Sequence, residues 1–184
     1  LFSQHTFGWT AKENGYIFTY VGIIIVLMQG GLVGQLVKRF GERTLLIAGL
    51  VILAAGLALL PWSTSLALML VALGILSAGN GAVTPTTSAL LSLASPREAQ
   101  GETLGLAQGV AGLGRVVGPL VAGSIYALIG PGAPFIAGSV LVLLAMLIAL
   151  PAMPLSRKLS QNEAISTGEV ESEEAREASV ARER

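Results

Sequence analysis

Five apolar stretches, each long enough to cross a membrane as a helix, dominate this sequence. A bilayer has a hydrocarbon core of about 30 Å, which takes about 20 apolar residues in helical form to span. The predicted spans are residues 16–37, 44–62, 66–93, 103–128 and 134–153. The sequence therefore predicts an all-α, polytopic membrane protein with five transmembrane helices.

Charged side chains are scarce and unevenly placed. They make up 12% of the chain, whereas an ordinary soluble domain carries about a quarter. The segment 157–184 holds five basic and seven acidic residues, which leaves six basic and four acidic residues for the rest of the chain. So few charges cannot cover the surface of a soluble fold. We expect a lipid bilayer around the helices and no nucleic-acid partner.

Basic residues in the short loops predict the orientation of the chain. Cytoplasmic loops of membrane proteins are enriched in Lys and Arg. If the five helices alternate, one side holds six basic residues and the other holds only Lys12; the six are Lys38, Arg39, Arg43, Arg97, Arg157 and Lys158. This bias predicts an integral protein of the plasma (inner) membrane. Residues 1–15 form an external loop, residues 16–155 a transmembrane domain, and residues 156–184 a polar, disordered cytoplasmic tail.

The number of spans indicates that helices precede this chain. An external amino end without a signal peptide is unusual for a complete five-helix protein. An odd number of additional helices before Leu1 would resolve the orientation. We therefore expect a truncated chain or a gene fragment.

Polar side chains divide the five spans into two kinds. Within the second and fifth spans, residues 45–60 and 135–150 are almost purely hydrocarbon, with Ser139 their one polar side chain, and we expect these spans to face lipid. The other three carry polar groups that are costly in lipid unless they face protein or a water-filled cavity. The candidates for a lumen or substrate surface are Gln29, Asn80, Thr84, Gln108 and Arg115. The alternative for Thr84 and its neighbours Thr86, Thr87 and Ser88 is hydrogen bonding between helices. Pro85 predicts a bend in the third span.

Arg115 is the one charged residue deep inside a predicted span. It lies about 12 residues, or roughly 18 Å, past the predicted start of that span, far for a side chain to reach the interface. We expect it to pair with another group or to serve a substrate path; the alternative is that it extends toward the cytoplasmic interface. No acidic residue lies deep in the five spans, so a carboxylate partner would come from outside this sequence.

Catalytic chemistry has little support in the composition. The chain has no Cys and no Asp, and its single His, His5, lies in the predicted external loop. Metal sites and two-carboxylate catalysis are therefore poorly supported, and the sequence has no phosphate-binding Gly-Lys loop. We expect a protein that is not an enzyme and that needs no metal or cofactor.

The loop between the first two spans, GQLVKRFGER, resembles a signature loop of the major facilitator superfamily. That signature is G-x-x-x-D-[RK]-x-G-[RK]-[RK], and a weaker copy joins the eighth and ninth helices of the family. Lys38 replaces the signature acid and Glu42 a basic residue, which argues against assigning a gating role to this loop. The residues of the loop motif are Gly34, Lys38, Arg39, Gly41 and Arg43. Gly34 suits a close helix approach and Gly41 a tight turn.

The fourth span carries a second resemblance, GRVVGPLVAG, to the G-x-x-x-G-P-x-x-G-G pattern of the family's drug:proton antiporter branch. Gly114, Gly118, Pro119 and Gly123 fit, whereas Ala122 stands where a glycine is usual. The alternative interpretation of the many glycines in this span is that they only form a face for helix packing. The resemblance covers residues 1–155 and implies helices eight to twelve, with helices nine and twelve on the outside and helix ten lining the cavity.

What the resemblance implies is alternating-access transport of a small molecule, with proton-coupled efflux as the expected form. It also implies a missing amino-terminal half as partner, so this chain alone should not transport. Two alternatives remain open: a non-transporting five-helix membrane scaffold, and an inactive gene fragment.

Overall fold

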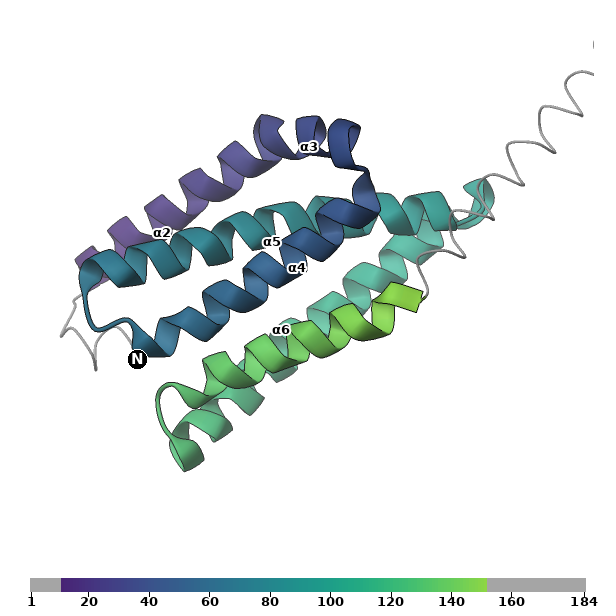
Figure 1. The fold of residues 1–184 in the computed structure, drawn as a ribbon. Coiled ribbons are helices and arrows are strands. Elements are labelled where there is room, and N and C mark those ends of the chain that lie inside the picture. Colours follow the sequence, from purple (N-terminus) through teal and green to yellow (C-terminus); the bar gives the residue numbers. More distant parts are fainter. Residues whose placement is uncertain (1–10, 152–184) are drawn as a thin grey trace, which may run out of the picture.

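The computed structural model describes residues 11–151, and this part of the chain is built from helices joined by short turns (Figure 1). Five helical stretches are long and apolar enough to cross a membrane, which confirms the prediction of an all-α, five-helix protein. In chain order the elements are α2 (Ala11–Leu27), η1 (Met28–Leu32), α3 (Val33–Phe40), α4 (Glu42–Leu59), η2 (Leu60–Trp62), α5 (Leu66–Ala94), η3 (Arg97–Ala99) and α6 (Gln100–Ile129). A last helix, Ala133–Pro151, ends the described part.

Several helix boundaries differ from the predicted spans, most of them by one to three residues. The first helix begins at Ala11, so residues 11–15, predicted as loop, are helical. Ala11 and Lys12 are good helix formers, and no proline stops the helix there. α6 begins at Gln100 rather than near residue 103, because an acidic residue such as Glu102 is favourable in the first turn of a helix. The tail and the expected end of the last span at residue 153 lie outside the described residues.

The first span is not one regular α-helix. Between α2 and α3 lies the π-helix η1, where the backbone N–H of Val33 bonds to the carbonyl of Met28. η1 contains Gly30 and Gly31, and Figure 1 shows that the path changes direction from α2 to α3. Glycine tolerates such a departure because it has no Cβ to clash with the widened turn. Single-turn π-helices of this kind recur at functional sites in other proteins.

The centre of the fold is a close contact between α4 and α5, which lie side by side in Figure 1. A Cβ on Gly79 would lie 2.5 Å from the backbone nitrogen of Leu53, and one on Gly56 would lie 2.6 Å from that of Leu76. Only glycine permits this backbone approach, which is the known use of small residues between membrane helices. The expectation that the second span simply faces lipid is therefore wrong: one face of α4 is buried against α5, although Val51 remains exposed.

Two further helices pack on this pair from opposite sides. α2 contacts α5, where the hydroxyl of Tyr20 donates to the carbonyl of Leu70 at 3.2 Å. The last helix contacts α4, where the hydroxyl of Ser139 donates to the carbonyl of Ala54 at 2.9 Å. The fifth span thus also has a protein-facing side, because its one polar group is used to bind a neighbouring backbone.

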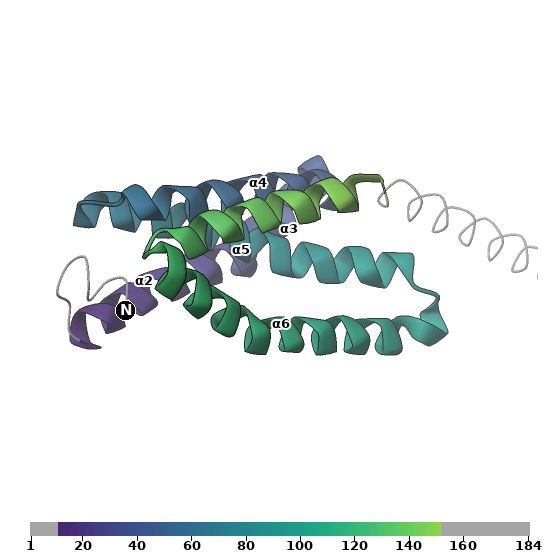
Figure 2. The ribbon, with the colours of Figure 1, turned by 90° about the horizontal axis from the view of Figure 1, so that it is seen from below.

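α6 lies at the edge of the molecule and contains no buried residue. Figure 2 shows it away from α4, connected to α5 at one end, and changing direction in its second half. Pro119 stands inside α6 and cannot supply a backbone N–H, which is the usual cause of such a change in direction. Because so little of this helix is covered, its polar residues are open to whatever surrounds the protein.

Candidate functional site

The five polar residues predicted to line a lumen are all exposed in the structure: Gln29, Asn80, Thr84, Gln108 and Arg115. They come from η1, α5 and α6. The structure joins only two of them by a hydrogen bond, from the hydroxyl of Thr84 to the carbonyl of Asn80 at 3.1 Å. The polar groups therefore form separate patches on open helix faces within the part of the chain that is described.

The polar residues of α5 fall on different faces of that helix. Ser77 and Thr86 are fully buried. Asn80, Thr84 and Thr87 are exposed, and their spacing of four and three residues places them in one stripe. We name Asn80, Thr84 and Thr87 the α5 stripe. Thr87 was not among the predicted lumen residues, although the same helical spacing in the sequence would have indicated it.

The hydroxyl groups of α5 do not bond between helices. Those of Thr84, Thr86, Thr87 and Ser88 each donate to the backbone carbonyl four residues earlier in α5. The alternative interpretation, that these residues form hydrogen bonds between helices, is therefore not what the structure shows. The physical reason is that a Ser or Thr hydroxyl in a helix can donate to the backbone carbonyl of the preceding turn, so it needs no acceptor from another helix. Along the α5 stripe, the amide group of Asn80 makes no side-chain hydrogen bond within the described residues.

Pro85 lies next to this stripe, in the middle of α5. Having no N–H, it leaves the carbonyl of Gly81 without its usual intrahelical donor. α5 nevertheless continues to Ala94, and Gly81 packs against Met28 of η1. The bend expected at Pro85 stays a prediction.

Arg115 and Gln108 share one face of α6. The positions 108, 112, 115 and 119 are separated by four, three and four residues, which brings Gln108, Gly112, Arg115 and Pro119 onto one side of the helix. Arg115 lies 15 residues after Gln100 and 14 before Ile129, or roughly 22 Å and 21 Å from the two ends. It is thus at the middle of the span, and its guanidinium forms no ion pair or hydrogen bond with a side chain of the described residues.

The glycines of the α6 motif are not packed. A Cβ built on Gly114, Gly118 or Gly123 would meet nothing within 4 Å. The interpretation of these glycines as a packing face is therefore not realised within residues 11–151, where close packing falls on α4 and α5 instead. The physical reason is that α6 touches few other helices, so its small residues have no neighbour to approach.

The loop motif lies at one end of the molecule. Lys38 and Arg39 lie in the last turn of α3, which ends at Phe40, and Arg43 follows in the first turn of α4. Gly41 has a φ of +79° and donates its N–H to the carbonyl of Val37, so it makes the turn that reverses the chain. Gly34, by contrast, has no neighbour within 4 Å of a built Cβ, so the expected close helix approach at Gly34 is wrong for the described residues.

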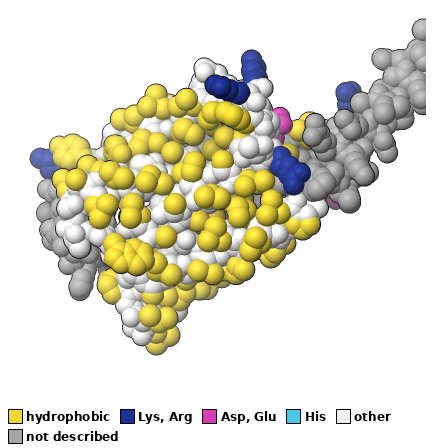
Figure 3. Space-filling model, viewed as in Figure 1, with side chains coloured by type: hydrophobic (Ala, Val, Ile, Leu, Met, Phe, Trp, Pro, Cys, Tyr) yellow, Lys and Arg dark blue, Asp and Glu magenta, His cyan; other side chains and the backbone are white. Residues whose placement is uncertain are grey.

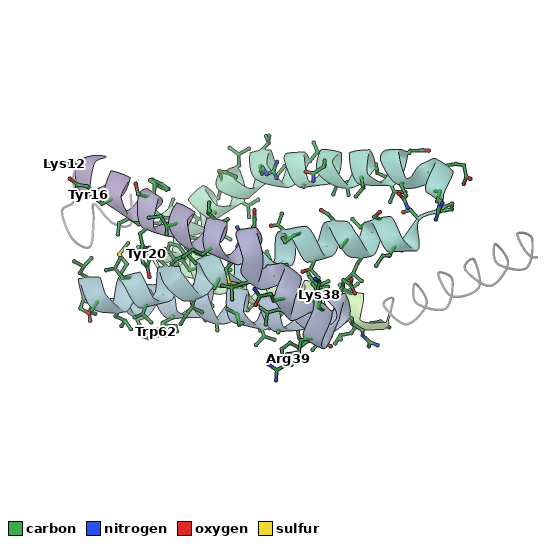
Figure 4. All side chains as sticks on the ribbon, turned by 90° about the horizontal axis from the view of Figure 1, so that it is seen from above. Lys12, Tyr16, Tyr20, Lys38, Arg39 and Trp62 are labelled. Atoms are coloured by element: carbon green, nitrogen blue, oxygen red, sulfur yellow. The ribbon has the colours of Figure 1, made fainter. Side chains whose placement is uncertain are left out.

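The surface is consistent with a bilayer around the helices. Hydrophobic side chains cover most of the face in Figure 3, and Lys and Arg side chains lie toward its edges. Figure 4 places Lys12 and Tyr16 at one end of the molecule and Lys38 and Arg39 toward the other. Trp62 lies toward the Lys12 end. Charges at the ends and hydrocarbon between them define an integral membrane protein.

Comparison with known proteins assigns the family. The sequence matches the Major Facilitator Superfamily over residues 1–180, and the chain therefore belongs to this family of membrane transporters. No solved structure matches the chain significantly.

Three curated relatives show what the chain is similar to. The tetracycline resistance protein, class C, of Escherichia coli is 32% identical over 156 residues, which cover 83% of this chain and 38% of the relative. The solute carrier family 22 member 18 of Rattus norvegicus is 31% identical, covering 86% of this chain and 38% of the relative. The multidrug resistance protein Stp of Mycobacterium tuberculosis is 33% identical, covering 68% of this chain and 24% of the relative. The chain thus spans less than half the length of these relatives.

Proposed function

We propose that this chain is the carboxy-terminal part of a proton-coupled transporter that exports a small molecule by alternating access, with its spans as helices eight to twelve. The observation that carries the proposal is the contrast between helices. α4 and the last helix are apolar and pack together through Ser139, whereas α5 and α6 present Asn80, Thr84 and Arg115 on open faces. Polar groups at membrane depth need protein or water beside them. A central transport path, completed by an amino-terminal half outside this chain, would provide both.

The substrate class follows from the same side chains and from the relatives. The proposed lumen offers the neutral hydrogen-bonding groups of Asn80, Thr84 and Gln108, which suit an uncharged polar organic molecule. Two of the relatives are named for resistance to tetracycline or to several drugs. Drug-like organic compounds, with tetracycline first, are therefore the substrates to test. Neither an enzymatic reaction nor a nucleic-acid partner is part of this proposal.

The orientation of the protein is part of the same proposal. Lys38, Arg39 and Arg43 would lie on the cytoplasmic side of the plasma membrane, together with the tail from residue 156. Lys12 and Trp62 would lie toward the outer surface, which matches their position at the other end of the molecule (Figure 4).

Single-cysteine labelling tests whether the open faces line a water path. The chain contains no cysteine, so each introduced thiol is unique within it. In the intact protein in membranes, Asn80→Cys and Thr84→Cys should react with a membrane-impermeant thiol reagent, and tetracycline should slow the reaction. The control is Leu147→Cys, on the exposed apolar side of the last helix, which should stay unlabelled. Inert thiols at both polar positions would favour the five-helix scaffold.

Transport itself is the second test. Liposomes that contain the intact protein should move tetracycline against its gradient when a proton gradient is imposed, and a proton uncoupler should stop the movement. Residues 1–184 alone should give no such flux, because the proposed path needs both halves. Tetracycline flux from residues 1–184 alone would overturn the proposal that the transport path needs both halves. No flux from the intact protein would favour an inactive gene fragment.

A further inference from the structure

Arg115 holds a positive charge at the middle of the most exposed helix of the fold. None of the apolar window of its span, Arg97–Ile129, is buried inside the structure. An arginine at the centre of a membrane helix is costly unless it pairs with an opposite charge, a backbone carbonyl or water. This chain must therefore obtain such a partner from beyond the residues that the structure describes.

The carboxylates of this chain cannot supply the partner. Within residues 11–151 they occur near the starts of helical segments, at Glu13, Glu42, Glu98 and Glu102. Glu102, which shares the helix of Arg115, is 13 residues away, or roughly 20 Å along the axis. A second copy would bring the same carboxylates at the same depths. The remaining acidic residues belong to 152–184, a polar sequence without an apolar run long enough to enter a bilayer.

The backbone beside Arg115 has an unmet requirement of its own. In an α-helix the carbonyl of residue 115 accepts from the N–H of residue 119. Residue 119 is Pro119, which has no N–H, so the carbonyl of Arg115 lacks that donor. A cation and a backbone acceptor are thus both unsatisfied at one level of α6. An approaching helix could meet both requirements with a carboxylate and a hydroxyl or amide donor.

The surface around Arg115 is shaped to admit such a helix. A Cβ on Gly112 or Gly118, three residues before and after Arg115, would meet nothing within 4 Å, so no described residue lies against α6 at these positions. Small residues let a second helix approach closely enough for a short ion pair. The positions three and four residues from Arg115 hold Ala111, Gly112, Gly118 and Pro119, so its own side of α6 is small and apolar. The positive charge of Arg115 requires an acidic partner, and the small residues beside it let a second helix come close enough to provide one.

We propose that Arg115 forms an ion pair with an Asp or Glu side chain on a transmembrane helix outside residues 11–151, and that this pair holds that helix against α6. The inference rests on the proposed function, which places such helices in the amino-terminal half. A protein carboxylate fits better than an anionic substrate, because the arginine stays in the membrane when the substrate has left. The geometry makes Arg115 a structural contact between the halves.

The test uses the intact protein, purified in detergent without substrate. Arg115→Gln should lower the melting temperature by several degrees. Arg115→Lys, which keeps the positive charge, should lower the melting temperature by less. Arg97→Gln is the matched control, since Arg97 is an exposed arginine at a helix end, and it should leave the melting temperature unchanged. Each intramembrane Asp or Glu of the other half is then neutralised singly and together with Arg115→Gln. One carboxylate should show a combined loss clearly smaller than the sum of the two single losses.

Other results would overturn the proposal. If Arg115→Gln leaves the substrate-free melting temperature unchanged but abolishes the rise caused by an anionic substrate, the arginine binds substrate instead. If its loss adds fully to that of every carboxylate, no ion pair exists. If Arg115→Gln does not fold, Arg115→Glu is combined with Arg at each candidate acid, and failure of every combination to recover folded protein overturns the pair. Tetracycline flux by the unmodified protein is measured in parallel, so that failure of the transport proposal is seen separately.

Discussion

The hydroxyl of Ser139 donates a hydrogen bond to the backbone carbonyl of Ala54, 2.9 Å away and 85 residues earlier in the chain. The bond joins the last helix to α4, and the Ser139 side chain is buried. A Cβ on Gly132 would approach Pro61 to 3.0 Å, so η2, which follows α4, also meets the turn that precedes the last helix. The two most apolar spans of the sequence are therefore partners in the fold.

Replacing Ser139 by alanine should weaken this contact modestly. Side-chain hydrogen bonds between membrane helices are worth about 0.6 kcal/mol on average, so Ser139→Ala should lower the free energy of unfolding by about that amount. Titration with sodium dodecyl sulfate from mild micelles measures the change. Ser124→Ala is the control, because Ser124 is exposed and bonds to Leu120 within its own helix. Equal losses for the two variants would show that the bond between helices adds nothing.

Adding a methyl group to Gly79 should disrupt the α4–α5 contact. The new Cβ would lie 2.5 Å from the backbone nitrogen of Leu53, which cannot move without displacing α4. Gly79→Ala should therefore cost roughly 1–3 kcal/mol, as overpacking does elsewhere. Thermal unfolding followed by size-exclusion chromatography measures the loss. Gly22→Ala, where nothing lies within 4 Å, should change stability by no more than about 0.5 kcal/mol. A neutral Gly79→Ala would contradict the close approach.

Tyr20 and Gly74 should show energetic coupling. A Cβ on Gly74 would lie 2.8 Å from the Tyr20 hydroxyl, which bonds to the carbonyl of Leu70. Gly74→Ala should push that hydroxyl away and break the bond, whereas in the Tyr20→Phe background the methyl group meets no hydroxyl. The double variant should thus be more stable than the sum of the single losses predicts, by about 0.5 kcal/mol or more. Strict additivity in a double-mutant cycle would rule out this contact between α2 and α5.

The two glycines of the loop motif should respond differently to alanine. Gly41 has φ +79° and ψ 158°, a backbone region that is essentially restricted to glycine, so Gly41→Ala should cost about 1–3 kcal/mol. Gly34 is helical and its Cβ position is open, so Gly34→Ala should change stability by no more than about 0.5 kcal/mol. Chemical denaturation of the purified protein compares the two. Similar losses at both positions would mean that the turn at Gly41 is not the cause.

Local features of the sequence predicted the class of fold well. The lengths of the apolar stretches alone indicated five helices, because any membrane-spanning helix needs about 20 apolar residues to cross the bilayer core. Gly41 could be expected in a turn, and it takes a backbone angle that other residues rarely adopt. The π-helix at Met28–Leu32 could not be expected, because a pair of glycines permits an irregular turn without specifying one.

Predictions about helix neighbours were less successful, and the glycines show why. Gly79 and Gly118 look alike in a sequence of glycine-rich helices, yet one lies against the backbone of Leu53 and the other has no neighbour within 4 Å. Thr84 and Thr86 are likewise two residues apart, but they lie on different faces of α5, one exposed and one buried. Composition does not distinguish such pairs, because the difference arises only when a second helix occupies one side.

The sequence by itself thus determined that the chain spans a membrane, that its helices are five, and that one of them carries a charge at mid-depth. These are properties of single segments, set by hydrocarbon length and by the cost of polar groups in lipid. Only the tertiary structure decided which helices touch, that α4 is held between α5 and the last helix, and that α6 is left open around Arg115. Such contacts depend on which backbones can approach each other, and that is a property of pairs of segments.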